Sequence, residues 1–131
     1  MHKSVNNLNL IQKLLKEKTK ANKIPKIVAV SKTFSISDIK PLLEYGHVDF
    51  GENKIQEALD KWSLVKRNFD SIKLHMIGKL QTNKVKFLIP LFDYFHSLDN
   101  LKLARKISEE EIKKKNKIKI FIQVNIGSED Q

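Results

Sequence analysis

A regular alternation of apolar runs with amphipathic segments constrains the fold of this 131-residue chain more than any other feature. Short apolar runs rich in β-branched residues predict strands, and the segments between them have helical spacing. The predicted strands cover residues 26–31, 48–51, 73–77, 94–98 and 118–126. Because strands and helices alternate without a hairpin signal, we expect an α/β fold with one parallel sheet. The pattern leaves open whether that sheet is doubly wound or a barrel.

Capping residues mark the ends of the predicted helices. Ser35 can cap the second helix, with Asp38 placed as in a capping box and Gly46 placed to end it. Asn53 can cap the third helix, in which Trp62 belongs to an apolar stripe. Core packing is therefore favoured for Trp62 over stacking on a ligand. The helices are predicted over residues 5–20, 35–45, 53–65, 83–89 and 99–115.

The formal net charge of +10 raises the question of nucleic-acid binding. The basic residues are almost all lysines, with Arg67 and Arg105 as the only arginines, whereas specific readers of phosphates and bases favour arginine. The lysines are spread along the chain, and the run 113–115 follows the acidic run 109–111, as is typical of a solvated helix end. Nucleic-acid binding is therefore disfavoured.

Composition and motifs argue against several other classes. The chain has no cysteine and no histidine cluster with metal-ligand spacing, so we expect no metal site. The four glycines form neither a GxGxxG turn nor a P-loop, which argues against a nucleotide site. No window approaches the ~20 apolar residues of a membrane span, and the first residues lack the apolar stretch of a signal peptide. We therefore expect a soluble, cytoplasmic protein.

Lys32 is the most informative polar residue. It directly follows the first predicted strand, residues 26–31, whose apolar run suggests burial on both faces. Reactive side chains of parallel α/β folds lie at the carboxyl ends of strands. We expect an ammonium group there to be poorly solvated, which favours a neutral amine that forms imines with aldehydes. The alternative is a lysine that simply leaves the strand into solvent.

Other polar residues lie in or after the next predicted strands. Glu52 and Asn53 follow the second strand, where contact with a ligand and ordinary helix capping are both open. His75 lies within the third strand, where a hydrogen-bonded core histidine is the commoner role. No Ser-His-Asp set can be assembled from the spacing. These residues are therefore open between a ligand-binding and a structural role.

Five segments have distinctive sequences: AVSKT at residues 29–33, FGENKIQEALDK at 50–61, LHMIGKLQTNK at 74–84, HSLDNLKLA at 96–104 and FIQVNIGSEDQ at 121–131. In this order they resemble motifs of the pyridoxal phosphate homeostasis proteins, which are single-domain relatives of the alanine racemase N-terminal barrel. They match the lysine strand, the FGEN-x-x-QE segment, the WH-x-IG-x-LQ-x-NK segment, the H-S/T-hydrophobic-D motif and the strand before the K-x-G segment. Leu74 stands where the family usually has an aromatic residue.

The resemblance implies a TIM-type (β/α) barrel that binds pyridoxal 5′-phosphate (PLP) at its C-terminal mouth. Lys32 would hold the cofactor as a Schiff base, and Asn53 and His75 would lie near the cofactor ring or its lysine. Family members have no well-established turnover reaction and act in vitamin B6 and amino-acid homeostasis. The resemblance therefore implies a PLP carrier or regulator rather than an enzyme such as a racemase.

A complete (β/α)₈ barrel typically takes about 250 residues. We therefore expect residues 1–131 to form a single domain, a barrel truncated to about its first five parallel strands with their helices. The favoured explanation is a fragment or truncated chain, with self-association or pairing with a separate C-terminal half as alternatives. A second function class is a basic interaction protein that binds RNA or acidic partners through its lysine-rich surface, without a functional PLP site.

Overall fold

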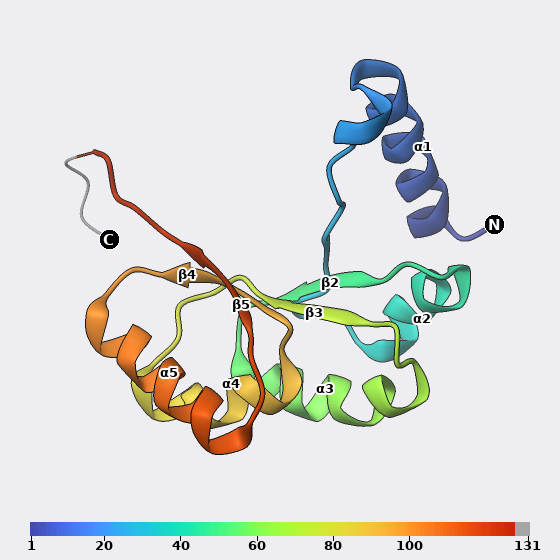
Figure 1. Cartoon of the computed structure of the whole chain (residues 1–131). Helices are drawn as coiled ribbons and strands as arrows, with labels where there is room; N and C mark the ends of the chain where they lie inside the picture. Colours follow the sequence, from blue (N-terminus) through green and yellow to red (C-terminus); the bar gives the residue numbers. More distant parts are fainter. Residues whose placement is uncertain (128–131) are drawn as a thin grey trace.

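The computed structural model describes residues 1–127 and contains one five-stranded sheet in which every pairing is parallel (Figure 1). The strands are β1 (Ala29–Val30), β2 (Asp49–Glu52), β3 (Lys73–Met76), β4 (Tyr94–Leu98) and β5 (Lys119–Ile122). They lie side by side in chain order, with no point at which the order reverses. A doubly wound sheet has such a reversal, so these five strands do not form one. The predicted α/β fold with one parallel sheet is confirmed.

The helices lie between the strands, as the alternation predicts. They are α1 (Lys3–Lys18), α2 (Ile36–Tyr45), α3 (Ile55–Asn68), α4 (Val85–Leu91) and α5 (Leu101–Lys114), with 3₁₀ turns η1 (Ala21–Lys23) and η2 (Thr82–Lys84). In Figure 1, α3, α4 and α5 lie side by side beneath one face of the sheet, and α1 lies beyond α2 at the other end of the molecule. The sheet therefore has one face that is packed against helices.

Local capping chemistry fixes the start and end of α2. Ser35 accepts a hydrogen bond from the backbone N–H of Asp38, and the Asp38 side chain accepts from the Ser35 N–H, which completes the predicted capping box. Gly46 ends the helix in the left-handed conformation, with φ of 97°, where a side chain would be strained. These contacts place the end of the β1–α2 turn, which carries Lys32.

The predicted cap of α3 is wrong. Lys54, not Asn53, is the N-cap residue, and no side chain caps this helix. Gln56, in the first turn of the helix, donates to Asp60 one turn later. Asn53 is therefore left outside the helix, at the carboxyl end of β2.

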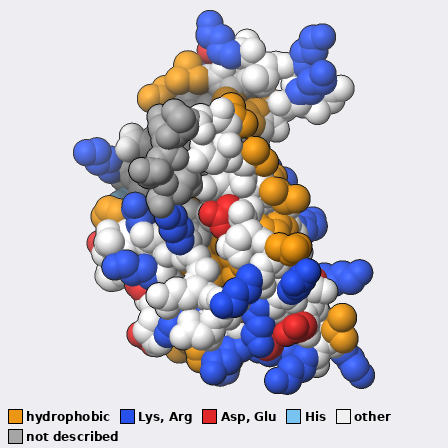
Figure 2. Space-filling model, turned by 90° about the vertical axis from the view of Figure 1, so that its left-hand side faces the viewer, with side chains coloured by type: hydrophobic (Ala, Val, Ile, Leu, Met, Phe, Trp, Pro, Cys, Tyr) orange, Lys and Arg blue, Asp and Glu red, His pale blue; other side chains and the backbone are white. Residues whose placement is uncertain are grey.

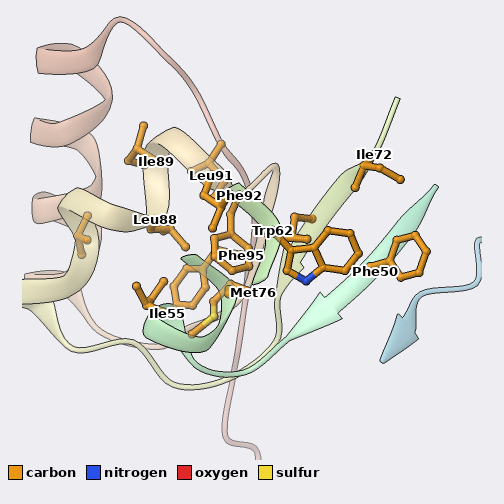
Figure 3. Packing of buried hydrophobic residues seen from close by; sticks show 14 of the residues in the cluster. Phe50, Ile55, Trp62, Ile72, Met76, Leu88, Ile89, Leu91, Phe92 and Phe95 are labelled. Atoms are coloured by element: carbon orange, nitrogen blue, oxygen red, sulfur yellow. The ribbon is translucent and has the colours of Figure 1, made fainter. Parts of the chain in front are cut away.

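The core lies between the sheet and its helices. Trp62 of α3 is completely buried and lies beside Phe50 of β2, with ring centroids 5.0 Å apart (Figure 3). Core packing, rather than ligand stacking, is confirmed for Trp62. Phe95 of β4 and Met76 of β3 face the same layer. Because side chains alternate along a strand, the residues between these core positions face the opposite side of the sheet.

The two outermost strands are less covered than the sequence predicts. Val30 of β1 is half exposed, so the expectation of a first strand buried on both faces is wrong. The regular part of β5 ends at Ile122, short of the predicted end at residue 126, and its Ile122 side chain is 74% exposed. Phe121 of the same strand is also exposed. The central strands β2 to β4 therefore carry most of the buried sheet.

Figure 2 shows the side of the molecule on which α5 lies. Lysine and arginine side chains dominate the lower part of this face, and hydrophobic side chains reach the surface above them. Among residues 1–127, no helix combines the length and the apolar character that crossing a bilayer requires.

Candidate functional site

Lys32 and Asn53 lie at the carboxyl ends of neighbouring strands. Lys32 is in the turn that follows β1, and Asn53 directly follows β2, which pairs with β1. Carboxyl ends of parallel strands are where α/β folds place reactive and ligand-binding side chains. The Lys32 side chain is exposed, so the expectation of poor solvation at this position is wrong. Its amine is accessible rather than buried.

His75 lies deeper in the same side of the sheet. Val30, Gly51 and His75 are register partners across β1, β2 and β3. Lys32 and Asn53 come two residues after Val30 and Gly51, so His75 lies about 6–7 Å further down the strand direction. The structure therefore brings Lys32 and Asn53 to one edge and places His75 one layer of side chains below them.

Asn53 has an oxygen atom that is free to bind. Its Oδ1 is buried and has no hydrogen-bond partner among residues 1–127. Gly78, after β3, lies directly against Asn53: a Cβ at Gly78 would lie 2.9 Å from Asn53 Cα and closer still to its carbonyl oxygen. Only glycine permits this approach. A buried acceptor without a partner is costly, which marks Asn53 as a ligand-binding candidate.

His75 is held by two polar side chains. Its Nε2 lies 2.8 Å from Asp49 Oδ1, and its Nδ1 lies 2.8 Å from His96 Nε2. A carboxylate only accepts hydrogen bonds, so His75 Nε2 carries a proton and donates to Asp49. The direction of the bond between His75 Nδ1 and His96 Nε2 depends on the tautomers of the two rings. Both ring nitrogens are therefore engaged, and the hydrogen-bonded role predicted for a strand histidine is confirmed.

Burial affects the titration of His96. Partial desolvation lowers its pKa below the ordinary value of 6.5, and the nearby His75 lowers this pKa further. The ring of Tyr94 stacks on the ring of His75, with ring centroids 4.2 Å apart and an interplanar angle of 2°. His96 is therefore biased toward the neutral form.

A buried ion cluster lies on the helix side of the β1 and β2 ends. We call Ser31, Glu52, Glu57 and Lys61 the carboxyl-end cluster. Lys61 Nζ lies 3.0 Å and 3.1 Å from the two carboxylate oxygens of Glu52, and 3.4 Å from Glu57 Oε1. The Glu52 side chain is fully buried and that of Lys61 is 7% exposed. Since buried charges are tolerated only when paired, these groups must stay together.

The same cluster binds the turn that carries Lys32. Lys61 Nζ donates to the backbone carbonyl of Ser31 at 2.7 Å, and the Ser31 hydroxyl donates to Glu52. The Glu57 carboxylate accepts from the Thr33 N–H at 2.6 Å. Thr33 has φ of 67°, a left-handed conformation that costs about 1–3 kcal/mol for a residue other than glycine. The contacts of the cluster offset that strain.

The sequence did not indicate either side-chain group as a unit. The Asp49–His75–His96 chain depends on the register of three strands, which no local pattern encodes. Glu52 was noticed only as a polar residue at a strand end. Lys61 lies in the predicted third helix, residues 53–65, but the apolar stripe around Trp62 gave no reason to look for a buried charge there.

Fold and site together define a class: a parallel α/β chain with an accessible lysine and a free amide oxygen at the carboxyl ends of adjacent strands. The chain is 35% identical over 128 residues to the pyridoxal phosphate homeostasis protein of Haemophilus influenzae, covering 95% of this chain and 54% of the relative. It is 36% identical over 133 aligned positions to the protein of that name from Buchnera aphidicola, covering 95% of this chain and 58% of the relative. No family model matches the chain.

A solved structure agrees with these relatives. PipY of Synechococcus elongatus with PLP bound superposes with a TM-score of 0.78 at 28% identity, covering 88% of this chain and 53% of that one. Over most of its length, this chain is therefore similar to pyridoxal phosphate homeostasis proteins, and the PipY structure that it resembles holds PLP. It spans about half the length of the relatives it matches.

Proposed function

We propose that this chain forms part of a PLP-binding (β/α) barrel that holds the cofactor as a Schiff base on Lys32. The observation that carries the proposal is the position of Lys32 after the carboxyl end of β1, with Asn53 after the carboxyl end of the neighbouring strand β2. The PLP-bound PipY structure supports the same ligand for the same fold. The unreversed strand order supports a barrel rather than an open doubly wound sheet.

The residues present fit the cofactor. Lys32 offers an accessible primary amine, and Asn53 Oδ1 is a buried acceptor without a partner among the described residues. Bound PLP would supply an aldehyde, with which a primary amine forms an imine. His75 has both ring nitrogens engaged, so its role would be to fix the orientation of His96 below the site rather than to donate to the ligand itself.

The proposed role is that of a carrier or regulator in vitamin B6 and amino-acid homeostasis. Its support is the homeostasis function named for the relatives. An exposed Lys32 suits reversible loading and release of the cofactor, because water and competing amines can reach the imine. The phosphate-binding segments that barrels place after strands 7 and 8 would come from outside the described strands.

A basic interaction surface is the second candidate. The observation that favours it is the gathering of lysine and arginine side chains on the face shown in Figure 2. Binding of an acidic partner there would weaken steeply as salt rises and would survive loss of Lys32. Schiff base formation requires Lys32, whereas binding of an acidic partner to the basic face does not. The substitution Lys32→Ala therefore separates the two candidate functions.

The test is an absorbance titration of the purified chain with PLP, followed by borohydride reduction and peptide mapping. We expect a yellow imine band and a trapped label on Lys32, both lost in Lys32→Ala. Lys40→Ala is the matched control, because Lys40 is an exposed lysine that forms an ordinary i,i+4 pair with Glu44. Label spread over many lysines, with no loss in Lys32→Ala, would contradict the proposal.

A further inference from the structure

The carboxyl-end cluster holds the backbone on both sides of Lys32. On one side, Lys61 Nζ donates to the Ser31 carbonyl at 2.7 Å. On the other, the Thr33 N–H donates to Glu57, whose Oε1 lies 3.4 Å from Lys61 Nζ. The Lys32 side chain is exposed. One buried ammonium group therefore links two main-chain attachments of the turn, in addition to the bonds from the Ser31 N–H to the Gly51 carbonyl and from the Phe34 N–H to the Ser31 carbonyl.

We propose that Lys61 is a positioning residue for Lys32, acting through the backbone of the turn. The inference rests on the proposed function only for the identity of the ligand, PLP. The contacts by which Lys61 restrains the turn are present in the chain without any ligand. The role of Lys61 is to fix the conformation of the turn in which Lys32 follows β1, at the strand ends where Asn53 also lies.

Charge balance explains why Lys61 is needed. Glu52 is fully buried and Glu57 is partly buried, so the ammonium group of Lys61 separates two carboxylates. Without it the carboxylates repel each other, and the Ser31 carbonyl loses one of its two donors, the other being the Phe34 N–H. Glu57 is then free to turn toward solvent and release the Thr33 N–H. The turn then keeps its own hydrogen bond from the Phe34 N–H to the Ser31 carbonyl, but Thr33 loses the side-chain contact that offsets its strain, and the turn becomes less restrained.

A second lysine of α3 provides a matched control. Lys66 Nζ donates to the Leu91 carbonyl at 2.7 Å and to Asp93 Oδ2 at 2.8 Å. Asp93 also accepts from the Leu74 N–H at 2.8 Å. We call Lys66, Asp93 and the main-chain groups of Leu74 and Leu91 the amino-end cluster. It joins the same chemical groups as the carboxyl-end cluster, but at the amino ends of β3 and β4.

Each cluster accepts a hydrogen bond from one backbone amide, that of Thr33 at the carboxyl-end cluster and that of Leu74 at the amino-end cluster. Hydrogen exchange at that amide reports whether the cluster is intact. The first experiment is therefore hydrogen exchange by NMR on Lys61→Met and Lys66→Met without any ligand. We expect exchange at Thr33 to rise about tenfold or more in Lys61→Met, the effect of one lost charged hydrogen bond, with Leu74 unchanged. The reverse is expected in Lys66→Met. Equal acceleration of both amides in Lys61→Met would mean general loosening and would overturn the inference.

The second experiment is PLP titration of the same variants. We expect Lys61→Met to weaken imine formation on Lys32 about tenfold or more, Lys61→Arg to restore most of it, and Lys66→Met to leave it unchanged. If Lys61→Met does not fold, Glu57→Gln tests the same attachment, because it keeps the Lys61–Glu52 pair and weakens the acceptor for Thr33. Unchanged Thr33 exchange and unchanged PLP binding in that variant would overturn the inference.

The two readouts separate this inference from the proposed function. A wild-type chain that forms no imine on Lys32 contradicts the proposed function, whereas Thr33 exchange still reports whether Lys61 holds the turn. A wild-type chain that forms the imine while Lys61→Met binds PLP equally well, with faster Thr33 exchange, overturns the positioning role alone.

Discussion

The carboxyl-end and amino-end clusters use the same chemistry at opposite ends of the sheet. In each, a lysine of α3 binds a carboxylate and a backbone carbonyl. Lys61 and Glu52 are almost completely buried, while the side chains of Lys66 and Asp93 are 22% and 29% exposed. The buried pair restrains a turn with a strained residue, and the exposed pair joins two regular strand ends.

This difference matches the division of labour in parallel α/β folds. Residues at the carboxyl ends of strands serve ligands, and those at the amino ends serve stability. A buried ion pair is an inefficient way to stabilise a fold, because desolvation consumes most of the attraction. Its occurrence beside Lys32 indicates that a defined backbone conformation is required there. The amino-end cluster has no such turn to hold.

The largest expected effect is that of Glu52→Gln. This substitution leaves the buried Lys61 ammonium group without its main partner. The free energy of unfolding should fall by about 3 kcal/mol, which is the low end of the range for breaking a buried ion pair. The loss is limited because Glu57 still pairs with Lys61. Urea unfolding measures it, with Glu44→Gln, an exposed i,i+4 partner of Lys40, as the control that should cost less than about 0.5 kcal/mol. A cost below 1 kcal/mol for Glu52→Gln would mean that the cluster is solvated.

A smaller effect is expected for Asp93→Asn. The asparagine still offers an oxygen to Leu74 but loses the charge that binds Lys66, so the free energy of unfolding should fall by about 1–2 kcal/mol. The same urea unfolding experiment measures it. Lys66 can turn into solvent, which limits the loss. If Asp93→Asn costs as much as Glu52→Gln, burial is not what distinguishes the two clusters, and the comparison fails.

The smallest expected effect concerns His96, which belongs to neither cluster. Its folded-state pKa is lowered, so between that pKa and 6.5 the unfolded chain binds more protons than the folded one. The free energy of unfolding should therefore decrease as the pH falls below 6.5, and His96→Gln should remove that part of the decrease. An NMR titration of the His96 ring checks the direction independently. A His96 pKa above 6.5 would contradict the predicted burial effect.

The sequence predicted local features because their causes are local. The capping box of Ser35 and Asp38, the left-handed Gly46 and the burial of Trp62 all depend on residues within one or two helical turns. The predicted α3 cap was wrong because Asn53 lies outside the helix, packed closely against Gly78 in the segment after β3, a contact between distant parts of the chain. The expected burial of Lys32 failed because β1 is a short outer strand whose exposure depends on its neighbours.

By itself, the sequence determined the alternation of strands and helices, the parallel sheet and the position of Lys32 after the first strand, since periodicity and capping act over short distances. Only the tertiary structure decided which polar groups meet: His75 with Asp49 and His96, and Lys61 with the turn around Lys32. Those contacts depend on strand register and on how α3 lies against the sheet. Both are set by packing of the whole core rather than by any local pattern.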